Sequence, residues 1–334
     1  MSHAPCSRAR GAIGCAALPV PGREVRGVIE YVFARSAHLR APDVFLTLGS
    51  PELPKHPFSI LTPHFPAGLR VGDGFSLRER GLWLDAGPIV DLCGLRRYRP
   101  AQNIARLAGP AALARTIEAA RETARAACDR GGLFPPAPGA APGRPAASPA
   151  WTCGPNGPRA PQAAQSPDRP KDPEELLRGR AGRLAARLGV AASARDWDGF
   201  ELTARDLAGL GPGLTPSGDD FLAGMLAALR FYGLSGGERV PQAVLDHLAG
   251  SAARRTSAFS GFLLRGAAQG LVAEPVCRWL CAVCAGKTRL AAQATLRVLD
   301  MGSSSGADTL AGLIAGLTAR SAANVCGTRE QLCA

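Results

Sequence analysis

The sequence predicts an α+β fold in which a small β-barrel-like domain precedes an all-α domain with an internal helical repeat. Three observations support this prediction. Short runs bounded by Gly, Pro and Asp, with a period close to two, occupy residues 25–100, and helical periodicity dominates after residue 173. A Ser-Gly-x-Asp motif occurs twice in the second half of the chain. Strands and helices that are segregated along the chain are typical of α+β proteins.

The first hundred residues divide into a leader and a β-rich part. Residues 1–24 contain basic residues and only a short apolar piece, so we expect a disordered leader there. Runs such as DVFLTLGS and FSILTP, each followed by a turn signal, predict a β-rich barrel-like domain at 25–100.

The rest of the chain is predicted to be helical on either side of an insertion. Residues 101–130 read as a helical connection, interrupted near Gly109-Pro110. Proline and glycine dominate residues 131–172, which predicts a disordered insertion. Residues 173–334 then carry several helical segments and form the predicted helical domain. Aromatic residues make up only 5% of the chain, so its core must rely on Leu, Ala and Val.

Composition limits the class of partner. The net charge is +12, but the arginines are scattered and the stacking aromatics of single-strand binders are scarce, so we expect no nucleic-acid partner. No apolar run reaches the roughly 18–20 residues that span a bilayer. The ten cysteines lack a disulfide framework, which favours a reduced, cytoplasmic protein. Cys277, Cys281 and Cys284 are expected to be buried thiols, since no second ligand pair for zinc follows them.

The most informative stretch is GLGPGLTPSGDD, residues 209–220. Gly211 and Gly213 permit a tight turn with positive φ. Ser217 is predicted to cap a helix, with Asp219 and Asp220 in its first turn, where the helix dipole favours negative charge. Helix capping explains one acid, but it does not explain two acids after a Gly-Pro-Gly turn.

The same pattern recurs without a gap at 305–317. SGDDFLAGMLAAL at 217–229 aligns with SGADTLAGLIAGL, so Asp220 pairs with Asp308, whereas Ala307 stands opposite Asp219. We interpret this as an internal repeat with approximate twofold symmetry. Two helix N-termini, each with a Ser-Gly start and an Asp, would then face one pocket.

This arrangement suits a small anionic substrate that carries an amide. Backbone N–H groups at helix N-termini bind phosphate or carboxylate, and aspartates accept from amide N–H groups. The segment RRTSAFSG supplies an additional anion-binding wall, although an ordinary solvated helix start explains it equally well. The candidate catalytic residues are Asp220, Asp308 and Asp219. The candidate substrate-binding residues are Gly211, Gly213, Thr215, Ser217, Gly218, Ser304, Ser305, Gly306, Thr256 and Ser257. No cofactor is expected, with magnesium at the three aspartates as the open alternative.

GLGPGLTPSGDDFLAG, followed much later by SSSGADTLAGL, resembles the family of the oxamate carbamoyltransferase subunit AllH. The resemblance extends from about residue 206 to the end of the chain. It implies a role in anaerobic allantoin and purine degradation, where oxalurate and phosphate are converted to oxamate and carbamoyl phosphate. It also implies companion carbamoyltransferase subunits. The N–H groups of both motifs would then stabilise the tetrahedral intermediate, and the aspartates would orient the ureido nitrogens.

Two alternatives remain open at this point. The Ser-Gly-Asp helices could form a packing motif in a non-catalytic binding or scaffold subunit. Paired aspartates at helix N-termini could also build a magnesium-dependent helical hydrolase.

Overall fold

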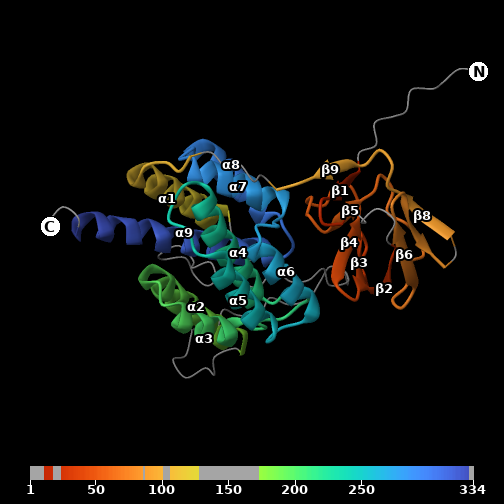
Figure 1. Cartoon of the computed structure of the whole chain (residues 1–334), viewed down its shortest axis with the longest axis horizontal. Coiled ribbons are helices and arrows are strands. Elements are labelled where there is room, and N and C mark those ends of the chain that lie inside the picture. Colours follow the sequence, from red (N-terminus) through yellow and green to blue (C-terminus); the bar gives the residue numbers. More distant parts are fainter. Residues whose placement is uncertain (1–10, 18–23, 86, 101–105, 128–172, 331–334) are drawn as a thin grey trace, which may run out of the picture.

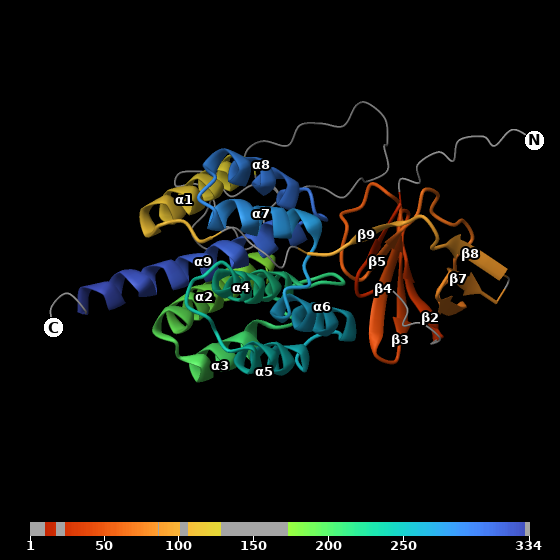
Figure 2. The ribbon, with the colours of Figure 1, turned by 45° about the horizontal axis from the view of Figure 1, so that its top comes forward.

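The computed structural model describes residues 11–17, 24–85, 87–100, 106–127 and 173–330. The expected insertion at 131–172 lies outside these residues. A curled sheet forms one part of the molecule and a bundle of helices forms the other, and the two parts lie side by side (Figures 1 and 2). The α+β prediction is therefore confirmed.

The described part of the sheet contains nine strands in the order β8-β7-β6-β2-β3-β4-β5-β1-β9. Most neighbours are antiparallel, but β4 and β5 are parallel, as are β1 and β9. The apolar residues of alternating positions, including Leu39, Leu46 and Ile60, form the core of the sheet. The strands are β1 Ala12–Gly14, β2 Val25–Val32, β3 Ser36–Ala41, β4 Val44–Gly49, β5 Ser59–Leu61, β6 Gly74–Arg78, β7 Gly81–Leu84, β8 Gly87–Asp91 and β9 Arg96–Tyr98.

The expectation of a disordered leader is wrong for residues 11–17. Ala12 pairs with Leu61 of β5 on one side and with Arg96 of β9 on the other. Ile13 is only 2% exposed and belongs to the sheet core. Burial of this short apolar piece between two strands outweighs its weak local signal. Residues 1–10 and 18–23 of the expected leader lie outside the described part.

The helices form one core, to which the helix before the insertion also contributes. α1 begins at Pro110, a position that suits proline because its missing N–H has no intrahelical partner there. Leu113 and Ile117 of α1 join the core of the later helices. The helices are α1 Pro110–Ala127, α2 Pro173–Ala194, α3 Trp197–Leu207, α4 Ser217–Leu234, α5 Gln242–Ala253, α6 Ala258–Ala268, α7 Glu274–Cys284, α8 Thr288–Leu299 and α9 Ser305–Glu330.

α4 and α9, the two repeated helices, cross through reciprocal glycine contacts. A Cβ atom added to Gly224 would overlap the carbonyl oxygen of Thr309, and one added to Gly312 would overlap that of Phe221. Gly224 and Gly312 are equivalent in the repeat, and so are Phe221 and Thr309. The contacts therefore obey the twofold relation that the sequence repeat predicts, and the absent side chains let the helices approach closely.

The sheet and the helices meet through aromatic rings and polar contacts. Phe58 lies 4.5 Å from Phe262 of α6, centroid to centroid. The Tyr98 hydroxyl donates to the carbonyl oxygen of Val272 at 3.0 Å. Lys55 pairs with Glu274 of α7 at 3.1 Å. These contacts hold the sheet against α6 and α7.

Two further expectations concern the helices. Cys277 and Cys284 are buried thiols outside any disulfide, as predicted, and Cys281 is half-buried. Within the described ranges, no group of three or more His, Cys, Asp or Glu side chains is placed to hold a metal ion. No helix in the same ranges is both long and apolar enough to span a bilayer.

Candidate functional site

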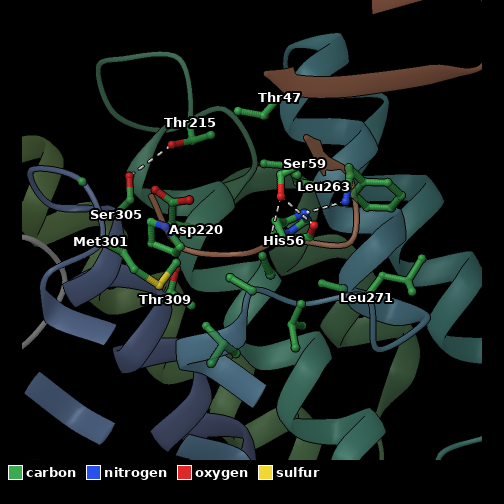
Figure 3. A pocket seen from close by; sticks show the side chains of 18 of the residues that line it. Thr47, His56, Ser59, Thr215, Asp220, Leu263, Leu271, Met301, Ser305 and Thr309 are labelled. Carbon is green, nitrogen blue, oxygen red and sulfur yellow. Dashed lines mark hydrogen bonds between the residues drawn. The ribbon is translucent and has the colours of Figure 1, made fainter. Parts of the chain in front are cut away.

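A cavity of about 330 Å³ opens where the sheet faces the helices (Figure 3). One wall comes from β4, β5 and the loop between them. The other comes from α4, α6, α7 and the start of α9. The cavity therefore lies at the N-terminal ends of the repeated helices, and both parts of the molecule contribute to it.

The polar end of the cavity is formed by Thr215, Asp220, Ser305 and Thr309 (Figure 3). The hydroxyls of Thr215 and Ser305 lie 3.2 Å apart, so the turn before α4 contacts the first residue of α9 directly. This contact joins the two Ser-Gly-x-Asp motifs at one place. The expectation that their helix N-termini converge agrees with this geometry.

Asp220 is the carboxylate of this polar end. Burial raises its pKa well above the ordinary value, and hydrogen bonds from Ser305 and Thr215 oppose that effect. The charge of Asp308 nearby raises the pKa further. The Oδ2 atom of Asp220 is buried and has no hydrogen-bond partner among the described residues. One oxygen of Asp220 is thus held beside the cavity without a hydrogen bond, although the carboxyl group itself is bonded to Ser305 and Thr215.

Asp219 serves a different purpose from its neighbour. Its side chain is 3% exposed, does not line the cavity, and accepts hydrogen bonds from the Gly209 N–H at 2.8 Å and from the Thr256 hydroxyl. Burial raises its pKa, while these bonds lower it. Asp219 therefore ties the loop before α4 to the loop before α6. This explains the second acid as a structural clamp.

Replacing Asp219 with alanine is expected to destabilise the fold by about 2 kcal/mol, because two donors lose a charged acceptor. Urea unfolding followed by circular dichroism measures this change. Thr256→Val removes one of the two donors and should cost roughly half as much. Asp206→Ala, at an exposed position of α3, is the control. Equal stability of the Asp219 and Asp206 variants would contradict the clamp.

The motif glycines partly meet their expected roles. Gly211 and Gly213 have φ values of 122° and 99°, as the tight turn requires. The N–H of Gly218 donates to Leu210 O at 2.9 Å, and that of Gly306 donates to Met301 O at 2.8 Å. Because both amides are already bonded within the protein, they do not provide the free N–H donors that the sequence suggested.

Several other expected site residues lie outside the cavity lining. Ser217 is not the N-cap of α4: that position is Pro216, whose carbonyl accepts from the next turn, and no side chain caps this helix. Ser257 instead caps α6 by accepting from the Ser260 N–H at 3.1 Å. Asp308 is fully buried and does not line the cavity. The Ser304 carbonyl accepts from the N–H of Asp308 at 3.0 Å.

The titration of Asp220 predicts a pH-dependent stability difference. A raised pKa means that the folded protein keeps a proton that the unfolded chain has already released. Asp220 therefore disfavours folding increasingly as pH rises from the ordinary Asp range through its raised pKa. We expect Asp220→Asn to melt above the wild type at neutral pH, by about 2–4 °C per kcal/mol relieved. The difference should shrink towards zero at acidic pH.

Melting curves of both proteins across this pH range provide the measurement. Asp206→Asn, which changes an exposed carboxylate, should follow the wild type throughout. A difference in melting temperature that does not change with pH would show that burial does not raise the pKa of Asp220.

His56 is a cavity residue that sequence reasoning missed. Its Nδ1 accepts from the Phe58 N–H at 3.3 Å, and Ser59 bonds to both its backbone N–H and its carbonyl oxygen. Burial lowers the pKa of His56 to about 4, so the ring is neutral at pH 7. Since Nδ1 is an acceptor, the ring proton resides on Nε2. No spacing in LPKHPFS indicates this role, because the cavity forms only when distant segments pack.

The rest of the lining is mainly apolar and lacks positive charge. Asp220 is the one carboxylate among the described lining residues, and none of those residues is Lys or Arg. The larger apolar members include Phe45, Phe58, Phe262, Leu263, Leu271 and Val276. The cavity thus has a small polar end and an extended apolar wall.

The described residues form an α+β protein with a cavity between a curled sheet and a pseudo-symmetric helical bundle. Residues 207–317 match the family model described as oxamate carbamoyltransferase subunit AllH. The match begins at the end of α3 and contains both Ser-Gly-x-Asp motifs, so it confirms the resemblance seen in the sequence. The description of that family names a subunit of an enzyme. No solved structure matches the chain.

Proposed function

We propose that this chain is a subunit of a carbamoyltransferase complex and that the cavity binds the carbamoyl group. The family match supports the reaction class. The observation that carries the site assignment is Asp220, whose buried Oδ2 lacks a partner at the edge of a largely apolar cavity. A carboxylate kept in such a place at a cost in stability is typical of a functional group.

The cavity offers the hydrogen bonds that a carbamoyl group needs. The carbamoyl NH₂ donates, and Asp220 supplies an acceptor. The carbamoyl oxygen accepts, and the Nε2–H of neutral His56 supplies a donor from the opposite wall (Figure 3). The hydroxyls of Thr215 and Ser305 can act in either sense. Donor and acceptor would thus orient the reacting carbon between the two parts of the molecule.

The reaction we propose is phosphorolysis of oxalurate or a related ureido compound in purine breakdown. A phosphate oxygen forms a bond to the carbamoyl carbon, and the bond from that carbon to the leaving nitrogen breaks. The leaving nitrogen takes up a proton, and the products are carbamoyl phosphate and an amide or amine. A raised pKa favours the protonated form of Asp220, and in that form its carboxyl group would deliver a proton to the leaving nitrogen.

Phosphate requires contacts that the described lining does not offer. Anionic phosphoryl groups are normally held by Arg, Lys or free backbone N–H groups. The described lining contains no Arg or Lys, and the Gly218 and Gly306 amides are already bonded. We therefore expect a companion subunit to complete the phosphate site.

Reconstitution tests this function. The chain is purified alone and together with the products of neighbouring genes, and carbamoyl phosphate formation from oxalurate and phosphate is measured. We expect activity only in the complex. A complex that assembles and is active, but whose turnover is unchanged by Asp220→Asn, would instead identify this chain as a scaffold subunit. Absence of any transferase activity with oxalurate and with other ureido compounds would reject the reaction class.

A further inference from the structure

We propose that Val28, Tyr31 and Phe33, here called the β2 surface, form the docking surface for the companion subunit. The existence of this subunit rests on the proposed function, in which it completes the phosphate site. The place where it binds follows from a separate observation: the β2 surface is an exposed apolar part of the sheet that continues one wall of the cavity.

The β2 surface and the cavity wall lie on the same side of the sheet. Tyr31 lies opposite His38 of β3, and His38 lies opposite Thr47 of β4, which lines the cavity. Val28 lies opposite Arg40, two residues from His38 along β3. Residues that lie opposite each other in paired strands point to the same side of a sheet. The side of the sheet that forms the cavity wall at β4 therefore extends across β3 to β2.

Aromatic contacts join the β2 surface to the cavity wall. The rings of Tyr31 and Phe33 lie 6.4 and 5.6 Å from the ring of His38, edge to face. His38 also lies 4.6 Å from Phe259 of α6, which lines the cavity. Figure 2 shows α6 beside β3 and β4, and none of the described helices beside β2. Phe259 is accordingly only 8% exposed, whereas Val28, Tyr31 and Phe33 are 46%, 36% and 48% exposed.

The charges around the β2 surface favour a protein partner that carries a free carboxylate. Arg26 pairs with Glu24 at 2.9 Å, and Arg40 pairs with Glu30 at 3.3 Å. An apolar centre bordered by polar groups is typical of protein interfaces, and the two glutamates would repel the phosphates of a nucleic acid. Arg35 is exposed and forms no ion pair with another described residue. A second copy of this chain would offer Arg35 only glutamates that are already paired.

A subunit bound to the β2 surface would lie at the edge of the cavity. Ser36, the first residue of β3, lines the cavity, and its carbonyl oxygen accepts from the Phe33 N–H at 2.7 Å. Arg35 lies between these two residues in the turn. A companion that contacts Phe33 and Arg35 could therefore extend its own Arg, Lys or backbone N–H groups to phosphate in the cavity.

Site-specific photocrosslinking tests this contact in the assembled complex. p-Benzoylphenylalanine replaces Tyr31 or Phe33 in the full chain, which is coexpressed with the products of neighbouring genes. We expect irradiation to join the chain to the companion subunit from both positions. The same probe at Leu290, which is 50% exposed on α8, is the control and should give no crosslink. A complex that assembles but gives no crosslink from either position of β2 would overturn the proposal.

Affinity measurements separate the apolar and charged parts of the surface. Phe33→Ala should raise the Kd for the companion about tenfold or more, as truncation of a central aromatic residue typically does. Arg35→Glu should also raise the Kd, and more at low salt than at high salt. Leu290→Ala and Arg289→Glu make comparable changes at exposed positions of α8 and should leave the Kd unchanged. All four variants should melt with the wild type. An unchanged Kd for Phe33→Ala would overturn the proposal.

Turnover distinguishes this proposal from the proposed function. With the companion in excess, Phe33→Ala should reach the wild-type kcat, because Phe33 acts in assembly. If the variant weakens assembly but the wild-type complex has no transferase activity, the proposed function fails and the docking surface stands. If the complex is active and Phe33→Ala binds normally, the docking surface alone fails. A wild-type chain to which no product of a neighbouring gene binds would overturn both.

Two further measurements address other occupants of the surface. Sedimentation that shows a wild-type dimer, dissociated by Phe33→Ala, would assign the β2 surface to a second copy and overturn the proposal. Binding of a single-stranded oligonucleotide that Phe33→Ala abolishes, with normal binding of the companion, would assign it to nucleic acid and overturn the proposal as well. We expect neither result.

Discussion

Gly312→Ala is expected to destabilise the protein by about 3 kcal/mol or more, although Gly→Ala within a helix normally stabilises. The added Cβ would overlap the carbonyl oxygen of Phe221 in α4. Backbone atoms of a packed helix cannot turn aside as a side chain can, so α4 and α9 must separate. Overpacking of a core typically costs 1–3 kcal/mol, and about 3 kcal/mol is expected where the obstacle is backbone. Chemical unfolding measures the change.

The twofold relation between α4 and α9 predicts an equivalent effect at Gly224. Gly224→Ala should cost about as much as Gly312→Ala, since its Cβ would overlap the equivalent carbonyl of Thr309. The double variant should cost less than the sum, because one separation of the helices relieves both overlaps. Gly182→Ala, where no atom lies within 4 Å of the new Cβ, should instead stabilise by roughly 0.5–1 kcal/mol. Similar stability of the Gly312 and Gly182 variants would show that the helices cross less closely.

Asp220→Asn is expected to lower the kcat of the reconstituted complex by about 10²-fold or more. Asparagine has nearly the same shape as aspartate, but it cannot hold and deliver a proton, and general acid–base catalysis contributes about 10²–10⁴-fold. Its amide oxygen still accepts from the carbamoyl NH₂, so KM should change much less than kcat. Steady-state kinetics with saturating phosphate measures both constants.

The controls for this variant address folding and assembly. Asp206→Asn makes the same chemical change at an exposed site and should leave kcat unchanged. Asp220→Asn should still copurify with the companion subunits and should melt no lower than the wild type. A reduced kcat accompanied by loss of assembly would assign Asp220 to the structure of the complex instead of to the chemistry.

The sequence indicates which helix starts lie at the cavity, because that signal is local and repeated. SGDDFLAG and SGADTLAG each describe one helix start, and their alignment pairs Ser217 with Ser305 and Asp220 with Asp308. Thr215 and Ser305 do meet, and Asp220 does line the cavity. The α+β fold class can also be predicted from the sequence, since the hydrophobic period changes clearly from two in the first part to a helical period in the second.

The sequence could not show which members of the motifs face the cavity. Asp219 and Asp220 are adjacent and chemically identical, yet one points to Gly209 and Thr256 while the other lines the cavity. Their directions depend on the path of the turn at Gly211 and Gly213, which the motif permits but does not specify. The repeat predicted that Asp308 would act at the site together with Asp220, but Asp308 is buried and does not line the cavity.

The residues that the sheet contributes to the cavity could not be predicted from local sequence patterns, for a different reason. His56 contributes only because the loop before β5 packs against helices that lie about two hundred residues later in the chain, as the numbers of His56 and Phe262 show. No periodicity encodes such a contact.

The position of β1 also has a consequence for how the sheet folds. β1 is the first described strand in the chain, yet it lies between β5 and β9, and its pairing with β9 joins Ala12 to Arg96. Both edges of β1 can be paired only after β9, the last described strand of the sheet, has been synthesised. Contacts between residues far apart in sequence slow folding, whereas neighbouring helices such as α7 and α8 can associate early. The helical core also depends on distant contacts, such as those of α1 and α4 with α9, so the cavity, which needs both the sheet and this core, should be the last feature to form.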